Sequence, residues 1–125
     1  MIPKFRAWHT PFTDNKFGQE MEYGRAGTLL SFAEMSPNDY ILMQSTGLKD
    51  KNGVESWEGN YLTKEGCWPF FIKWIENEGC LMAVPVNSIQ KTNWKPVSVK
   101  ELLDKGYVNN SNIYENPELL EVEND

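Results

Sequence analysis

The sequence predicts a single β-dominated domain that spans residues 1–125 and holds one short helix. Two observations predict this fold class. The chain has five Trp, six Phe and five Tyr in 125 residues, and aromatic side chains favour the pleated, half-buried surface of a sheet. Its apolar residues also come in short runs that Gly, Pro, Asn and Asp separate, which is typical of many short strands joined by turns.

The N-terminal part is expected to hold short strands around one long, turn-rich loop from His9 to Gly27. Ser36–Asp39 is expected to be a turn, because Pro37 presets φ and the Asn and Asp side chains bond to nearby backbone. The strands expected in this part are Lys4–Trp8, a weak one at Glu20–Tyr23, Thr28–Phe32 and Tyr40–Gln44.

Two turn signals follow in the middle of the chain. Asn52-Gly53 predicts a hairpin with a type I′ turn, which requires positive φ at both central residues. Trp57-Glu58-Gly59 marks a second bend, and a short strand is expected after it at Tyr61–Thr63.

The clearest hairpin lies in the aromatic region beyond this bend. Cys67–Ile75 is expected to pair with Cys80–Val86 across the turn Asn77-Glu78-Gly79. Pro69 and Pro85 have no amide hydrogen to donate, so each is expected at an edge or a bulge of the sheet.

One helix is signalled, at Ser98–Lys105. Ser98 and Glu101 form a capping box, and Gly106 is placed to end the helix. The β-rich body, residues 1–97, is therefore followed by a segment, residues 98–125, that holds this helix, a final strand and an acidic tail. The final strand is expected to contain Tyr107-Val108 and Asn112–Tyr114.

The charge balance and the cysteines limit the class of protein. The net charge is −6, and residues 98–125 hold two basic and seven acidic side chains. This balance disfavours sequence-independent binding to nucleic-acid phosphates, which requires clustered Lys and Arg. The longest apolar run is too short to span a membrane. We therefore expect a cytoplasmic protein without membrane contact, in which Cys67 and Cys80 are reduced.

Three segments carry a family resemblance. They are Ile2-Pro3-Lys4-Phe5-Arg6-Ala7-Trp8, Met43-Gln44-Ser45-Thr46-Gly47-Leu48-Lys49-Asp50-Lys51-Asn52-Gly53 and Asn112-Ile113-Tyr114-Glu115-Asn116-Pro117-Glu118-Leu119-Leu120. In this order, at the start, middle and end of the chain, they make the sequence similar to the YopX family of phage and prophage proteins. The resemblance implies a phage or prophage origin and an SH3-like barrel or roll. It implies no reaction, because that family is functionally uncharacterised.

The chain departs from the family pattern at two places. The family usually has an acidic residue after its first strand, where this chain has His9. An acidic residue usually follows the central Glu-Gly as well, whereas here the run is Trp57-Glu58-Gly59-Asn60. Both differences weaken the case for a ligand shared with the family.

The recurring segments also have a structural interpretation, which we prefer. Gly47, Gly53 and Gly59 are placed where turns require left-handed or crowded backbone. Leu119 and Leu120 would be costly to expose, so the C-terminal tail is expected to dock on the body or on a neighbouring molecule. Asn116-Pro117 would redirect the chain so that they can.

The possible chemistry is limited. His9 is the only side chain with an ordinary pKa near neutrality, and beside Pro11 in a loop it is expected to be solvated. Catalysis would require Cys67, Cys80 or a carboxylate next to His9. Two distant cysteines and one histidine are too few ligands for a zinc site, and the sequence has no phosphate-binding or dinucleotide motif. We expect no enzymatic activity, no cofactor and no metal.

The sequence therefore predicts a non-enzymatic phage or prophage accessory protein that binds another protein of the host, of the phage, or a second copy of itself as a homo-oligomer. The candidate interaction surface is Trp57, Trp68, Trp74, Leu119 and Leu120. The alternative is a nucleic-acid-binding β-barrel that stacks bases on exposed aromatics, which the acidic balance disfavours. A third possibility is an enzyme that uses His9.

Overall fold

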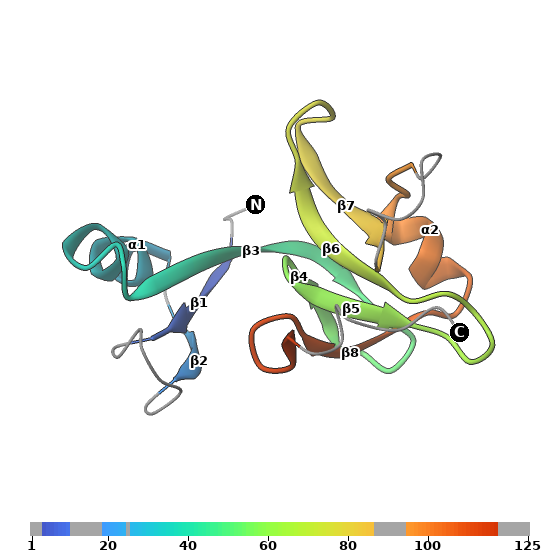
Figure 1. Ribbon diagram of the computed structural model, residues 1–125, viewed down its shortest axis with the longest axis horizontal. Coiled ribbons are helices and arrows are strands. Elements are labelled where there is room, and N and C mark those ends of the chain that lie inside the picture. Colours follow the sequence, from blue (N-terminus) through green and yellow to red (C-terminus); the bar gives the residue numbers. More distant parts are fainter. Residues whose placement is uncertain (1–3, 11–18, 25, 87–94, 118–125) are drawn as a thin grey trace. The chain divides into compact units, whose positions relative to one another are not determined.

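The computed structural model describes residues 4–10, 19–24, 26–86 and 95–117 of the chain. These residues form a mainly β structure with two four-stranded antiparallel sheets, one of them a curled half-barrel, and two short helices. The chain divides into two compact units, residues 1–45 and 46–125. Figure 1 shows the elements of each unit, which we describe in turn. That the whole chain acts as one domain stays a prediction.

The first unit contains β1 (Phe5–His9), β2 (Glu20–Tyr23), α1 (Ala26–Met35) and the beginning of β3 (Tyr40–Lys49). β1 lies between β2 and β3 and pairs antiparallel with both. In this register Ala7 lies opposite Glu22 and Leu42, and His9 lies opposite Glu20 and Tyr40. α1 packs against β1, and Leu29 is buried.

The strands predicted near residues 4–8, 20–23 and 40–44 are confirmed, but the strand predicted at Thr28–Phe32 is wrong. That segment lies inside α1, so the prediction of one helix is also wrong. A five-residue apolar window does not distinguish a strand from a helix. The wider sequence adds a helical signal, because the helix-favouring residues Ala33, Glu34 and Met35 follow the window.

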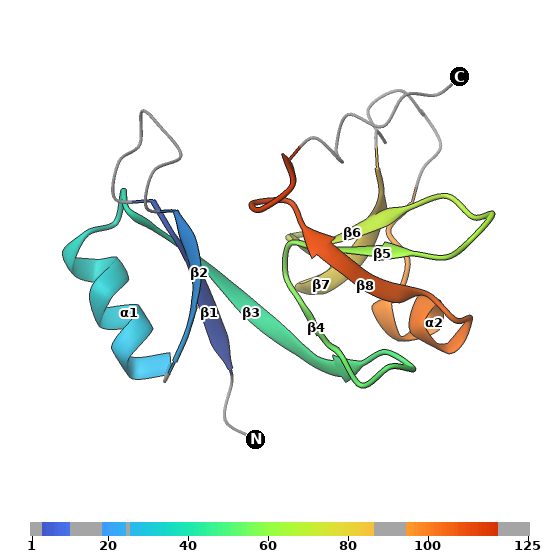
Figure 2. The same cartoon turned by 90° about the horizontal axis from the view of Figure 1, so that it is seen from below.

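The second unit contains the rest of β3 together with β4 (Glu55–Trp57), β5 (Asn60–Thr63), β6 (Phe70–Ile75), β7 (Cys80–Pro85), α2 (Val99–Asp104) and β8 (Val108–Asn112). The strand orders of the two sheets are β2-β1-β3-β4 and β7-β6-β5-β8. Figure 2 shows the curl of the second sheet beside α2. The core lies between this second sheet and α2 and consists of Leu62, Ile72, Ala83, Val99, Leu102 and Tyr107.

The predicted hairpin of β6 and β7 is confirmed, with Ile72 opposite Ala83. β7 is an edge strand, as Pro85 at its end requires. Part of that edge is covered, because Ala83 and Val97 exchange two backbone hydrogen bonds of 2.8 Å.

The turn after β3 differs from its prediction. Gly53 has φ 81°, but Asn52 does not have the positive φ that a type I′ turn would also require. The amide of Gly53 donates to the Asp50 carbonyl, and the amide of Asp50 donates to the Val54 carbonyl. This is a three-residue hairpin loop that ends in a left-handed glycine, so the hairpin is confirmed and the type I′ turn is wrong.

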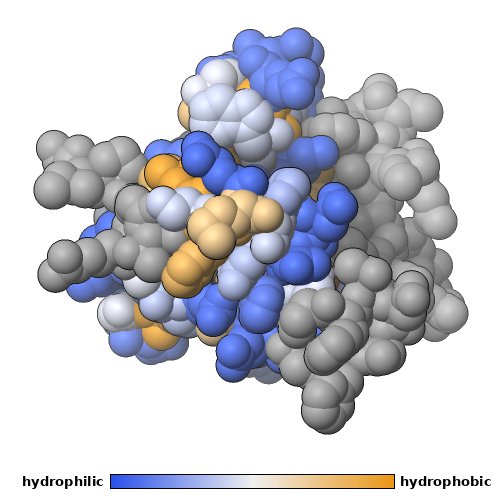
Figure 3. Space-filling model, turned by 90° about the vertical axis from the view of Figure 1, so that its left-hand side faces the viewer, coloured by the Kyte–Doolittle hydropathy of each residue, from blue (hydrophilic) through white to orange (hydrophobic). Residues whose placement is uncertain are grey.

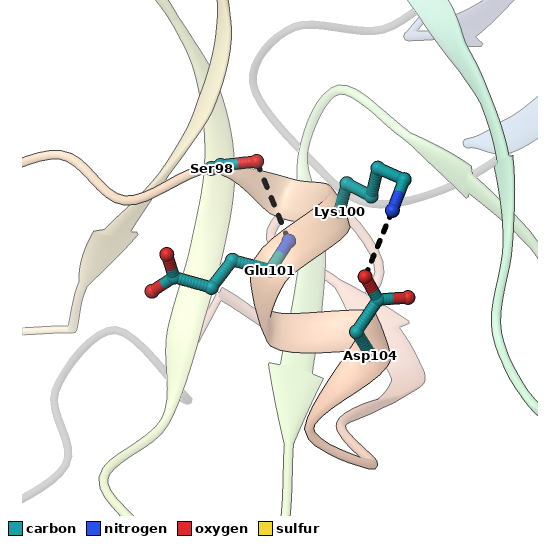
Figure 4. Close-up of polar contacts among 4 residues, drawn as sticks. All are labelled: Ser98, Lys100, Glu101 and Asp104. Atoms are coloured by element: carbon teal, nitrogen blue, oxygen red, sulfur yellow. Dashed lines mark hydrogen bonds and ion pairs between the residues drawn. The ribbon is translucent and has the colours of Figure 1, made fainter.

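The C-terminal helix begins and ends as predicted. The Ser98 hydroxyl accepts a hydrogen bond of 3.3 Å from the Glu101 amide, as Figure 4 shows. Gly106 follows the helix with φ 99°. The final strand is shorter than predicted, because Ile113 and Tyr114 lie in a turn after β8.

Candidate functional site

The structure places three of the five residues predicted to form an interaction surface. Trp57 and Trp68 are half-buried, and the indole N–H of Trp68 donates to the Val86 carbonyl at 2.9 Å. Trp74, on β6, is 46% exposed. Leu119 and Leu120 lie outside the described residues. A joint surface made by all five residues therefore stays a prediction.

His9 is the last residue of β1 and is not in a loop, so the expectation that it is simply solvated is wrong. Strand pairing places Glu20 directly opposite it, and Glu22 lies two residues further along β2 on the same face. His9 Nδ1 is 3.9 Å from Glu22 Oε2. The imidazole stacks on the ring of Tyr40, with centroids 4.4 Å apart.

This cluster is polar but partly closed to water. The side chains of His9 and Glu22 are 23% and 33% exposed. Glu22 Oε2 is buried and has no hydrogen-bond partner among the described residues. Burial raises the pKa of the Tyr40 hydroxyl above its usual value, and the negative charges of Glu22 and Asp39 raise it further. Tyr40 is therefore a neutral phenol at physiological pH.

Three large apolar side chains of α1 are exposed. Leu30, Phe32 and Met35 are 40%, 41% and 79% exposed. Glu34 is the only charged residue among the ten residues of this helix. A surface helix normally carries charges on the side away from its sheet. Phe32 stacks on Tyr40 of the sheet, so Leu30 and Met35 are the candidate contact residues of α1.

Asp50, in the central resembling segment, is a structural residue. It is buried, and its Oδ1 accepts hydrogen bonds from the amides of Asn52 and Val54 at 2.9 and 3.0 Å. Its Oδ2 accepts from the backbone and side-chain amides of Asn109 at 2.9 and 3.1 Å. Burial alone would raise the pKa of Asp50, but these hydrogen bonds outweigh it and hold the pKa below its usual value. Asp50 thereby fastens the β3–β4 loop to β8.

The C-terminal segment is organised by Asn112, which is buried at the end of β8. Its side-chain oxygen accepts from the amides of Tyr114 and Glu115 at 3.0 and 2.9 Å, and its NH₂ group donates to Glu115 at 2.7 Å. Tyr61 donates to the Asn116 carbonyl at 3.1 Å, which ties the turn to β5. Such side-chain-to-backbone bonds are what Asn supplies in turns.

Two of the three resembling segments thus contain turns that side-chain hydrogen bonds of Asp50 and Asn112 hold in place. The match to a known family covers much more of the chain than these segments, because the family model described as YopX protein matches residues 9–121. This chain belongs to the YopX family.

One solved structure shares the fold over nearly the whole length of both chains. It is the crystal structure of protein EF1440 from Enterococcus faecalis, which is 28% identical, with a TM-score of 0.53. The match covers 96% of this YopX family member and 99% of EF1440. No curated protein matches the chain. The comparisons therefore give a family and a fold but specify no function.

A cleft in the second unit gathers positive charge that the sequence did not show as a cluster. Lys51, Lys64 and Lys105 line it from three separate segments, and its volume is about 670 Å³. Its other lining residues are Asn52, Thr63, Glu65, Gly106 and Val108, so it contains no aromatic side chain. An anion could be held here, but no base-stacking platform is present in its lining.

Two further observations concern the cysteines and a membrane-spanning helix. Cys67 and Cys80 are exposed free thiols. Within the part of the chain that the structure describes, no helix combines the length and apolar character needed to cross a bilayer.

Proposed function

We propose that this YopX family member is a non-enzymatic phage or prophage accessory protein that acts by binding a different protein. The exposure of two large apolar side chains of α1, Leu30 and Met35, is the observation that supports this proposal. Figure 3 views the molecule from the side of α1 and shows hydrophobic surface bordered by hydrophilic residues. Apolar surface exposed on a folded protein gains about 25 cal/mol for each Å² that a partner covers.

The chemistry of this part of α1 also suggests what kind of partner fits it. An apolar helix face is commonly recognised by laying it into an apolar groove of another protein. The charged residues on and just after α1, Glu34 and Asp39, are both acidic. We therefore expect a groove that is apolar at its centre and carries Lys or Arg at its rim, because opposite charges orient and speed the encounter.

The second candidate is a nucleic-acid-binding protein with an SH3-like β-barrel. The lysine cleft of Lys51, Lys64 and Lys105 favours it, since phosphate binding depends on clustered basic side chains. The net charge of −6 opposes it. Trp74, the most exposed of the described tryptophans, does not line the cleft, so the stacking and charge contributions are not brought together there.

The test is site-specific photocrosslinking of the full chain in phage-infected or prophage-carrying cells, with and without nuclease. A photoreactive residue is placed at Leu30, and a control is placed at Lys100, which is exposed on α2 in the other unit. We expect one protein to be captured at Leu30, insensitive to nuclease and absent at Lys100. Met35→Glu should reduce this capture at least tenfold without changing the melting temperature.

Other outcomes would overturn the proposal. Capture that is equal at both positions, or unaffected by Met35→Glu, would remove α1 as the contact surface. A crosslinked dimer would replace the separate partner by a second copy of the chain. Loss of all capture after nuclease treatment would place the nucleic-acid candidate first.

A further inference from the structure

We propose that His9, Glu20 and Glu22 bind one divalent transition-metal ion, of which Zn²⁺ is the best match. Candidate ligand atoms of the three residues all lie within 4.8 Å of one another. One imidazole nitrogen and two carboxylates form a mixed donor set that zinc accepts in proteins. The count of cysteine and histidine missed this site, because it leaves out carboxylates from a neighbouring strand.

Strand pairing fixes the positions of the three residues. His9 and Glu20 are directly opposite each other on β1 and β2, and Glu22 follows Glu20 on the same face of β2. Opposite residues in an antiparallel pair have Cβ atoms only about 5 Å apart. The backbone of two paired strands therefore brings the ligands together, and the geometry does not depend on a loop.

The distances require only a small adjustment to hold an ion. Two ligand atoms on a tetrahedral Zn²⁺, each roughly 2.0–2.2 Å from it, lie roughly 3.4 Å apart. His9 Nδ1 and Glu22 Oε2 are separated by 3.9 Å. Glu20 is exposed and can rotate its carboxylate inward. Bringing the three ligand atoms to zinc-binding distance therefore requires movement of side chains and no shift of the strands.

A second observation, independent of the spacing, points to a cation. Glu22 Oε2 has almost no solvent-accessible area and no hydrogen-bond donor among the described residues. A buried carboxylate oxygen without a partner is costly, and the cost is larger for a charged group. His9 does not supply the missing hydrogen bond, because 3.9 Å is too long for one. A metal ion between the two groups would satisfy both.

Tyr40 completes the arrangement without being a ligand. Its ring lies nearly parallel to the imidazole, at an interplanar angle of 12°. This stacking restricts rotation of the His9 ring, and positioned ligands bind metal more tightly than mobile ones. Three protein ligands leave at least one position for water. The ion would fasten β1 to β2 on the face where Phe32 of α1 stacks on Tyr40.

The test uses the full chain after removal of metal with EDTA, and its readout is the imidazole itself. The chain has one histidine, so its ring ¹⁵N and ¹H resonances report on His9 alone. Zn²⁺ is titrated in a Cys67→Ser, Cys80→Ser background, because both exposed thiols could bind zinc on their own. We expect the His9 resonances to shift in one step that is complete at one equivalent of Zn²⁺.

Matched variants separate a site from adventitious binding. Glu22→Gln and Glu20→Gln should each weaken Zn²⁺ binding at least tenfold, since each removes a charged ligand. Glu34→Gln, the same change at an exposed carboxylate on α1, should leave it unchanged. The proposal is overturned if the His9 resonances do not move at millimolar Zn²⁺, or if Glu22→Gln and Glu34→Gln bind equally well. Circular dichroism of each variant checks that the fold is kept.

Discussion

The four hydrogen bonds that Asp50 accepts from Asn52, Val54 and Asn109 form a clasp between the β3–β4 loop and β8. Replacing Asp50 by Asn tests whether this Asp50 clasp stabilises the second unit. The substitution keeps the shape of the side chain but exchanges one acceptor oxygen for an NH₂ group. Each carboxylate oxygen of Asp50 accepts two hydrogen bonds, Oδ1 from Asn52 and Val54 and Oδ2 from Asn109. Whichever way the new amide is oriented, two partly buried donors lose their acceptor and face another donor.

The size of the effect follows from these contacts. A hydrogen bond to a charged group contributes about 1.5–3 kcal/mol, and contributions that share one acceptor group are not additive. We therefore expect Asp50→Asn to lower the free energy of unfolding by about 2–4 kcal/mol. Small domains unfold with about 5–15 kcal/mol in total, so this is a large fraction of the stability.

Urea unfolding followed by tryptophan fluorescence measures this change, because Trp57, Trp68 and Trp74 all lie in the second unit. Asp104→Asn is the matched control. It makes the same chemical change at a carboxylate that is 65% exposed and pairs with Lys100 at 2.9 Å, as Figure 4 shows. Exposed pairs contribute about 0–1 kcal/mol. If Asp50→Asn destabilises the unit no more than Asp104→Asn, the clasp is not a stabilising element.

Two further predictions concern the same unit. Hydrogen bonds outweigh burial and hold the folded-state pKa of Asp50 below its ordinary value of 3.8. The stability that Asp50 contributes is therefore fully present above that pH and is lost as the pH falls through the folded-state pKa. The stability difference between wild type and Asp50→Asn should shrink in urea titrations below pH 4, and a difference that is constant from pH 7 to pH 2.5 would contradict this. Gly106→Ala should lower the melting temperature, because φ 99° after α2 is strained for any residue with a Cβ and costs about 1–2 kcal/mol. Gly24→Ala serves as the control, since Gly24 does not have positive φ and its nearest neighbour is Leu29 at 3.8 Å. Equal effects of the two changes would argue against backbone strain.

Local signals predicted most of the strands and the second helix. Ser98, Glu101 and Gly106 marked the limits of α2, because capping depends on side chains within one turn of the helix end. The β6–β7 hairpin was equally local. The errors arose where local signals compete, as in Thr28–Phe32, whose helical state is selected by packing on β1 that a short window cannot reveal.

The candidate sites depend on contacts that are distant in sequence, which explains why they were missed. Asp50 and Asn109 are 59 positions apart, and neither residue marks the other. His9 and the two glutamates meet only because of the register between β1 and β2. One usable signal was present, since Glu20 and Glu22 alternate with Met21 and must share a face if the segment is a strand.

The two units differ in buried polar atoms that have no hydrogen-bond partner among the described residues: the second unit has the neutral hydroxyl of Ser56, and the first has a carboxylate oxygen of Glu22. In the second unit the buried carboxylate of Asp50 accepts four hydrogen bonds, and a contiguous apolar core lies between sheet and helix. In the first unit a buried oxygen of Glu22 has no donor among the described residues, and α1 exposes Leu30 and Met35. Both features of the first unit raise the free energy of the isolated chain, and each would be relieved by a different ligand: a cation at Glu22 and an apolar groove at α1. The turns and the Asp50 clasp in the resembling segments of the second unit are accounted for by folding, so the proposed binding functions are best sought in the first unit.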